Sequence, residues 1–231
     1  MKKLILCFLS LFVLSVAQAQ SIEPGEYIQG DGWGTLTVKK NKDKNIFDIS
    51  SLGANFHSCT VDGEFDNKNI AELETMDGEP KCKITFTKKD KGILVDASDT
   101  CRYFCGARAS FDGEYFVPEK GCKNKEVNNS RKLFKKLYGQ KKYDEALAVL
   151  EPVLNNCSNT LFWSEIDWIR NDLAVTMAKV DRKEDCRKIL EPLVEVASMN
   201  DDEIKNEYLP MEVDIHLSIA KAARTNLKLC K

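Results

Sequence analysis

Cysteines are the side chains of this 231-residue chain whose number and spacing most clearly suggest chemistry. Cys7 lies in an apolar N-terminal run, and eight further cysteines follow, an even number that is typical of disulfide bonding in an oxidising compartment. A zinc site would need a second close cysteine pair or a histidine cluster, whereas only Cys101 and Cys105 are close in sequence and the chain has just two histidines. We therefore expect no metal and no cofactor, and disulfides at Cys59, Cys82, Cys101, Cys105, Cys122, Cys157, Cys186 and Cys230.

Neither histidine stands in a pattern that is typical of a catalytic site. His57 precedes Ser58 and Cys59, but a cysteine in a disulfide cannot act as a nucleophile. His216 lies two residues from an aspartate and two from a serine on a predicted helix, and residues two apart do not share a helix face. The sequence also contains no glycine-rich phosphate-binding motif. We therefore expect a protein that is not an enzyme.

The first nineteen residues have the pattern of an export signal. Two lysines precede an apolar run over residues 4–16, and Ala-Gln-Ala at 17–19 is a small-x-small cleavage site. The apolar run is too short to span a bilayer as a helix. We expect the signal peptide to cover residues 1–19, the mature chain to begin at Gln20, and the protein to be periplasmic or secreted and not membrane-spanning.

The first half of the mature chain has the period-two pattern of strands. Apolar and polar residues alternate at 35–39, 46–50, 83–87 and 107–112, and turn-forming residues separate such segments about every ten residues. Strands with one apolar face must share a core, and closing the sheet removes exposed edges. About eight strands of this kind predict a small antiparallel β-barrel.

From about Asn128 the apolar spacing becomes helical. Two helices are expected before residue 155, and three more over about 160–179, 183–196 and 210–229. Pro152 and Pro192 should each kink or shorten the helix that contains them. The chain is thus expected to be a two-domain α+β protein, with the barrel at 20–122 and a helical domain at 123–231.

The helical half contains an internal repeat. The sequence Leu-Glu-Pro-Val-Leu at 150–154 returns forty residues later as Leu-Glu-Pro-Leu-Val at 190–194, which indicates two stacked helical hairpins. Tyr143 and Ala146, with the Leu173-Ala174 pair, make residues 128–198 similar to tetratricopeptide repeats, although the family's tryptophan and proline marks are missing or shifted. The resemblance implies a helical groove that can bind protein partners, with the last helix as a cap.

Stacked hairpins also predict disulfide pairs. The end of a hairpin's second helix lies near the start of its first, and an antiparallel capping helix ends near the first turn of the fourth helix. The pairs expected on this basis are Cys122–Cys157 and Cys186–Cys230. Elimination leaves Cys59–Cys82 with Cys101–Cys105 in the barrel, and the alternative of Cys59–Cys101 with Cys82–Cys105 remains open.

Two segments are candidates for contact with a protein partner. A disulfide-bonded loop and strand at 101–115 would present tyrosine and arginine, which are favoured anchors of protein interfaces. In the helical half, Trp163 and Trp168 lie five residues apart and therefore on different faces of a predicted helix. We expect one of them to pack in the helical core and the other to face the barrel or a partner. The expected partner-binding residues are Arg102, Tyr103, Arg108, Tyr115, Trp163, Trp168 and Arg170.

The segment at 101–115, with His57-Ser58-Cys59 and Lys81-Cys82, makes residues 26–116 similar to the small disulfide-bonded barrels of periplasmic lysozyme inhibitors. One group of those inhibitors inserts a Ser-Gly-x-x-Tyr loop into the lysozyme cleft, and here Ser110, Gly113 and Tyr115 stand at a different spacing. Residues 20–122 carry 13 basic and 18 acidic side chains, an imbalance that attracts a basic partner.

These observations favour a non-enzymatic protein-binding protein of the cell envelope. The lysozyme-inhibitor resemblance implies that its acidic barrel binds a basic lysozyme. The alternative is an envelope scaffold or assembly factor that binds partners through the helical groove. The sequence shows no basic stripe, so we expect no nucleic-acid partner.

Overall fold

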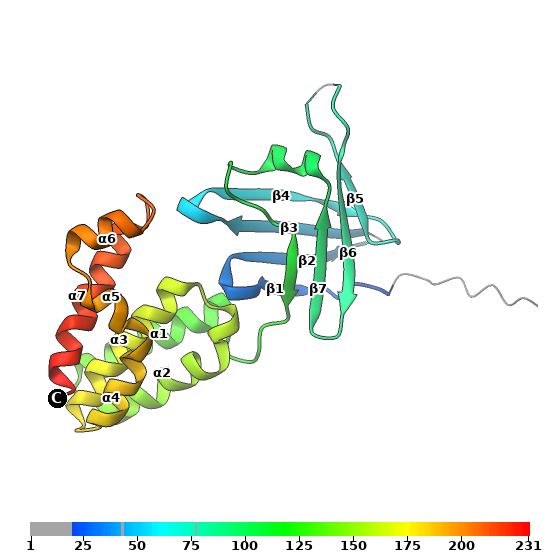
Figure 1. The fold of residues 1–231 in the computed structure, drawn as a ribbon. Coiled ribbons are helices and arrows are strands. Elements are labelled where there is room, and N and C mark those ends of the chain that lie inside the picture. The colour runs from blue at the N-terminus through cyan, green and yellow to red at the C-terminus, as the bar shows by residue number, and fades with distance from the viewer. Residues whose placement is uncertain (1–19, 43, 77) are drawn as a thin grey trace, which may run out of the picture.

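The computed structural model describes residues 20–231 apart from 43 and 77, and these residues form two domains (Figure 1). The first is an antiparallel sheet curled into a nearly closed barrel, and the second consists of helices, so the predicted α+β class is confirmed. The expected signal peptide at 1–19 lies outside the described residues. None of the helices described is both long and apolar enough to cross a bilayer.

The barrel contains eight strands in the order β4-β3-β2-β1-β8-β7-β6-β5, each antiparallel to its neighbours. The two outer strands, β4 and β5, follow one another in sequence and are joined by a turn in which the Asp66 N–H donates to the Ile70 carbonyl at 2.9 Å. The strand bounds are β1 Gly25–Gln29, β2 Gly34–Asn41, β3 Lys44–Leu52, β4 Ser58–Phe65, β5 Ile70–Leu73, β6 Cys82–Lys89, β7 Gly92–Ala97 and β8 Gly113–Phe116.

The period-two pattern places one side of each strand in a shared core. Phe47 on β3 and Phe86 on β6 are buried with their ring centroids 5.0 Å apart, and Leu36 and Val95 are fully buried beside other apolar side chains. Burying apolar surface of this kind is the main favourable term in folding. The alternation at 107–112 does not form the expected strand, because this part of the chain crosses one end of the barrel, where pairing between β7 and β8 begins only at Val95 and Gly113.

The second domain, here called the helical domain, contains seven α-helices among the described residues. α1 packs on α2, α3 packs on α4, and α7 packs against α3, α4 and α5 (Figure 1). The helix bounds are α1 Asn124–Gly139, α2 Tyr143–Cys157, α3 Trp163–Lys179, α4 Lys183–Leu190, α5 Val194–Ser198, α6 Asp201–Glu207 and α7 Val213–Leu229.

The forty-residue repeat is visible in the turns between helices. Lys141 between α1 and α2 has φ 62° and Asp181 between α3 and α4 has φ 61°, so the two turns use the same left-handed residue. The Lys142 N–H donates to the Leu137 carbonyl at 3.0 Å, and the residues forty positions later, Arg182 and Met177, repeat this bond at 2.9 Å. The two hairpins are therefore structural copies of one another at their turns.

The two repeat prolines act differently. α2 continues through Pro152 without a break, contrary to the expected shortening. At Pro192 the expected helix over 183–196 is divided, because α4 ends at Leu190 and a 3₁₀ turn over Glu191–Leu193 precedes α5. The Arg170 guanidinium donates to the Ile189 carbonyl at 3.3 Å, so a side chain satisfies a carbonyl at the end of α4.

Four disulfides connect the eight cysteines of the part of the chain that the structure describes. Cys122–Cys157 and Cys186–Cys230 confirm the pairs that helix stacking predicts. In the barrel the pairs are Cys59–Cys105 and Cys82–Cys101, so both arrangements considered from the sequence are wrong. The reason is topological: the chain leaves β7 beside β6, where Cys101 meets Cys82, and then crosses the barrel end to β4, where Cys105 meets Cys59.

The barrel and the helical domain are in direct contact. Phe162, just before α3, packs edge-on against Trp33 of the barrel with ring centroids 5.0 Å apart. Gly32 lies so close to Phe162 that an added Cβ would be 2.3 Å from the Phe162 nitrogen. In the connection between β3 and β4, the Asn55 N–H donates to a Glu212 carboxylate oxygen at 2.8 Å. These contacts fix the two domains on either side of the 117–123 connection.

Candidate functional site

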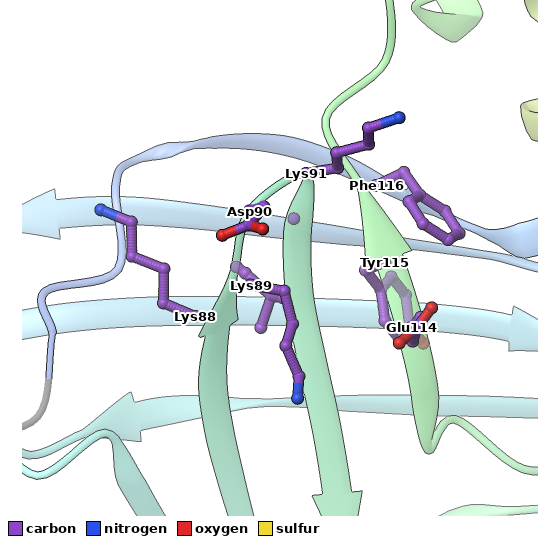
Figure 2. Close-up of a pocket in the computed structure, with 9 residues that line it drawn as sticks. Lys88, Lys89, Asp90, Lys91, Glu114, Tyr115 and Phe116 are labelled. Atoms are coloured by element: carbon purple, nitrogen blue, oxygen red, sulfur yellow. The ribbon is translucent and has the colours of Figure 1, made fainter.

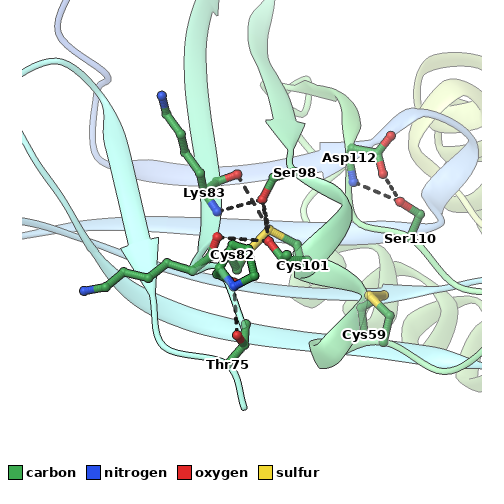
Figure 3. Close-up of a disulfide and its surroundings, with 12 residues drawn as sticks. Cys59, Thr75, Cys82, Lys83, Ser98, Cys101, Ser110 and Asp112 are labelled. Atoms are coloured by element: carbon green, nitrogen blue, oxygen red, sulfur yellow. Dashed lines mark hydrogen bonds between the residues drawn. A yellow bond between two sulfur atoms is a disulfide. The ribbon is translucent and has the colours of Figure 1, made fainter. Parts of the chain in front are cut away.

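The candidate site is the stretch of chain at 98–112 that crosses one end of the barrel, here called the mouth segment. It leaves β7, forms a 3₁₀ helix over Asp99–Phe104, and runs without regular structure into β8. The two barrel disulfides lie beneath it, and Figure 3 shows Cys101 joined to Cys82 on β6 with Cys59 nearby. Each disulfide ties the segment to a different strand.

Hydrogen bonds hold the first part of the mouth segment on β6 (Figure 3). The Ser98 N–H donates to the Lys83 carbonyl at 2.9 Å, and the Lys83 N–H donates to the Ser98 hydroxyl at 2.9 Å. The Thr100 hydroxyl donates to the Lys81 carbonyl, also at 2.9 Å. These bonds pair backbone groups of residues 81 and 83 with the start of the mouth segment, beyond the point where β7 ends.

The second part of the mouth segment lies on β3, β4 and their connection. The Gly106 N–H donates to the Ser58 carbonyl at 2.8 Å, and the buried Ser51 hydroxyl donates to the Ser110 carbonyl at 2.8 Å. Gly53 allows the closest approach, since a Cβ there would lie 2.0 Å from the Arg108 carbonyl oxygen. The segment is therefore fixed along its length as well as at its disulfides.

The end of the mouth segment is anchored from inside the barrel. Tyr115, one of the expected partner-binding residues, is 0% exposed, and its hydroxyl donates to the Phe111 carbonyl at 2.8 Å. Burial raises the pKa of this phenol well above its usual value. The structure thus places Tyr115 in the core, where it supports the segment and presents no surface to a partner.

Three other expected partner-binding residues, Arg102, Tyr103 and Arg108, are exposed on the mouth segment. Tyr103 is 54% exposed and packs edge-on against Phe104 with ring centroids 5.2 Å apart. Arg102 and Arg108 are exposed and form no ion pair with any residue that the structure describes. A hollow of about 200 Å³ is lined by Arg102, but not by Tyr103 or Arg108; its other lining residues include Ser98, Asp99, Ala109, Ser110 and Asp112.

The two histidines lie in different domains, and neither imidazole makes a hydrogen bond with another residue that the structure describes. His57 packs against Gly106 of the mouth segment, and the neighbouring Cys59 is disulfide-bonded. His216 lies between two rings, with centroids 4.3 Å from Trp163 and 3.5 Å from Tyr208. Burial lowers the pKa of His216 from its usual value, while Glu212 acts in the opposite direction.

The remaining expected partner-binding residues belong to α3 and do not join the mouth segment. Trp163 stacks on His216, and Trp168 is half-buried against the helical core. Arg170 caps the end of α4 through the Ile189 carbonyl. The aromatic residue that faces the barrel is Phe162, which the sequence places in the same aromatic cluster but does not single out.

One face between α1 and α3 holds charged groups that the sequence pattern did not indicate. Burial raises the pKa of the Asp172 carboxyl, against the opposing effect of Arg131 and Lys135 on α1. The Arg131 Nε is buried without a hydrogen-bond partner among the described residues, although its Nη1 lies 3.5 Å from Glu165. No sequence signal could find this face, because it depends on how two helices pack.

A second hollow, of about 370 Å³, lies at the hairpin between β6 and β7. Figure 2 shows its lining, in which Lys88, Lys89 and Lys91 stand near Glu114 and Phe116. The charges there are mixed, so this hollow by itself does not select a ligand.

The geometry of the mouth segment is suited to recognition by contact. It offers a fixed backbone and exposed tyrosine and arginine, and the Ser110 hydroxyl donates to the Asp112 carboxylate within it. Comparisons with known proteins add no assignment: the chain matches no family model, and searches of curated proteins and of solved structures found no match.

Proposed function

We propose that this protein is an exported, non-enzymatic protein-binding protein that captures its partner with the mouth segment. One observation carries the proposal: a segment tied down by two disulfides exposes Tyr103 together with Arg102 and Arg108, and neither arginine has an ion-pair partner among the described residues. A fixed binding segment loses little conformational entropy on association. Tyrosine and arginine are also the side chains that most often dominate binding energy. The four disulfides support an oxidising compartment.

The specific form that we propose is inhibition of a basic lysozyme of the cell envelope. The excess of acidic side chains in residues 20–122 supports it, because complementary charge speeds and orients association. A rigid segment with an exposed tyrosine at the end of a small barrel also suits contact with an enzyme cleft. Lysozyme activity would then fall because the segment blocks access of the substrate.

The test is a titration of lysozyme with the mature chain. We expect activity to fall to a plateau at one equivalent, and Tyr103→Ala and Arg108→Ala to weaken inhibition by about tenfold or more each. Leu133→Ala on α1, where Leu133 is 46% exposed and far in sequence from the segment, is the control and should inhibit normally. Undiminished lysozyme activity in excess protein would remove the lysozyme proposal.

A second candidate is an envelope scaffold that uses the helical domain. The half-buried charged side chains of Asp172 and Arg131 favour it, because a partner that covers this face would exclude water and strengthen their electrostatic interactions. Arg131→Gln should then abolish capture of envelope partners that Tyr103→Ala leaves intact. If Tyr103→Ala abolished capture of envelope partners and Arg131→Gln did not, the scaffold role of the helical domain would be excluded.

A further inference from the structure

A cleft lies between the two domains, at the opposite end of β7 from the mouth segment; it is here called the interdomain cleft. It has a volume of about 450 Å³, within the range of small-molecule sites, which often lie between domains. The barrel side is formed by Gly30, Asp31, Lys91, Phe116, Val117 and Glu119, and the helical side by Asn156, Asn159 and Thr160.

Both ends of the interdomain cleft are fixed by strong contacts. The disulfide Cys122–Cys157 joins the two sides next to Asn156 and three residues after Glu119, with a Cα–Cα distance of 5.2 Å. Gly32, beside the lining residue Asp31, packs directly against the backbone before α3. The cleft is therefore held open at a set width before any ligand arrives, which lowers the entropic cost of binding.

The side chains of the interdomain cleft have unused hydrogen-bonding capacity. Asp31, Lys91, Glu119, Asn156 and Asn159 make no side-chain hydrogen bond or ion pair with any other residue that the structure describes. Carboxylates accept, the ammonium group donates, and each amide does both. Donors and acceptors are thus both present around one small space.

An apolar surface completes the lining. Phe116, shown with Lys91 in Figure 2, projects from the outer face of β8, and Val117 next to it is 59% exposed. A ring that carries hydroxyl groups at its edge and C–H groups on its face matches this arrangement, because each hydroxyl both donates and accepts.

We propose that the interdomain cleft binds a short neutral oligosaccharide. Two carboxylates against one ammonium group disfavour a phosphate or another anionic ligand. Addition of a peptide strand is excluded at this place, because β8 is already paired with both β1 and β7. The site is separate from the mouth segment, so the proposal does not depend on the proposed function.

The experiment is an NMR titration of the mature chain with three trisaccharides. We expect saturable shifts of amide resonances at 30–31, 116–119 and 156–160 with cellotriose or N-acetylchitotriose, and none with the anionic trigalacturonate. The double variant Asn156→Ala/Asn159→Ala should raise the dissociation constant by about tenfold or more, since it removes two amides that can each donate and accept. Asn155→Ala, on the same helix but outside the cleft, is the matched control and should bind normally.

Each remaining outcome counts against the proposal. Absence of shifts with both neutral sugars would overturn it, and so would equal binding of trigalacturonate or shifts confined to the mouth segment. Phe116→Leu gives an independent check, because it keeps an apolar side chain but removes the aromatic face. Unchanged affinity in this variant, together with unchanged affinity in the double asparagine variant, would place any sugar binding elsewhere.

Discussion

Two disulfides that enclose almost equal lengths of chain have different effects on the surface of the molecule. Cys59–Cys105 in the barrel spans 46 residues and Cys186–Cys230 in the helical domain spans 44. The first fixes an exposed segment in which Tyr103 lies on a short 3₁₀ helix, two residues before Cys105. The second joins the residue after α7 to the first turn of α4, within structure that is already helical and packed.

The comparison shows that a disulfide can stabilise the fold without shaping a binding surface, or can do both. Restriction of the unfolded chain depends mainly on loop length, so the two disulfides should stabilise the fold about equally. Of these two disulfides, only Cys59–Cys105 holds an exposed segment whose regular structure is limited to one short 3₁₀ helix. The mouth segment is therefore the place where losing a disulfide should change binding as well as stability.

The largest predicted effect tests this comparison. The double variants Cys59→Ser/Cys105→Ser and Cys186→Ser/Cys230→Ser should each lower the free energy of unfolding by about 4 kcal/mol, measured by urea denaturation. Limited trypsin digestion should separate them, because Arg102 and Arg108 lie in the segment that only the barrel variant releases. Equal cleavage at these arginines in both variants would show that the disulfide does not hold the segment.

The helical disulfides could be predicted from sequence because they depend on local geometry. The amphipathic periodicity predicts the helices, and the forty-residue repeat predicts that they form two hairpins. Such a hairpin brings Cys157 back to Cys122. The turns repeat at the same offset, which is why helix ends such as Gly139 and Lys179 also correspond. Pro192 was predictable as an interruption, whereas continuation through Pro152 was not, since propensity does not account for packing.

The barrel disulfides and the mouth segment could be predicted only in part. Residue types drew attention to Arg102, Tyr103 and Arg108, and the structure exposes all three. The alternation over 107–112 suggested a strand, but a strand needs a neighbour with which to pair, and that depends on the order of strands around the barrel. The same order decides that Cys101 meets Cys82, so the number of cysteines alone could not give the pairing.

The contact between the domains should show the next largest effect. Gly32→Ala places a Cβ 2.3 Å from the Phe162 nitrogen at a residue with φ 70°, so we expect a loss of about 3 kcal/mol in the free energy of unfolding. Gly121→Ala is the control: its φ is 92°, but nothing lies within 4 Å of an added Cβ, and a loss of about 1 kcal/mol is expected. Equal losses would mean that backbone strain, and not the domain contact, determines the effect.

A carboxyl group in the helical domain should make part of the stability depend on pH. Burial raises the pKa of Asp167 on α3 from 3.8 to about 6, with Arg170 opposing the shift. The native state therefore binds this proton more tightly than the unfolded state does. The protonated carboxyl stabilises the native state below about pH 4, and this contribution to the free energy of unfolding is lost as the pH rises from about 4 through about 6. At pH 7 Asp167→Asn should raise the free energy of unfolding by about 1 kcal/mol, after allowance for partial exposure, and below about pH 4 the difference should vanish.

Asp202 on α6 gives the opposite sign and so serves as the control. Its hydrogen bond to Lys205 lowers the pKa of the carboxyl, so the ion pair stabilises the native state at neutral pH and its contribution disappears as pH falls through the lowered pKa. Asp202→Asn should therefore be less stable than the parent at pH 7 and equal to it in acid. If both variants shifted in the same direction, burial of Asp167 would not be the cause of its effect.

The smallest predicted effect on stability concerns the exposed residues beside the two matched disulfides. Tyr103 and Leu229 are 54% and 44% exposed, so Tyr103→Ala and Leu229→Ala should each change the free energy of unfolding by no more than about 0.5 kcal/mol. Their effects on partner binding should differ, because only Tyr103 projects from the mouth segment. A stability loss in Tyr103→Ala as large as that of a core substitution would show that this side chain supports the fold, and its role as a binding anchor would then have no basis.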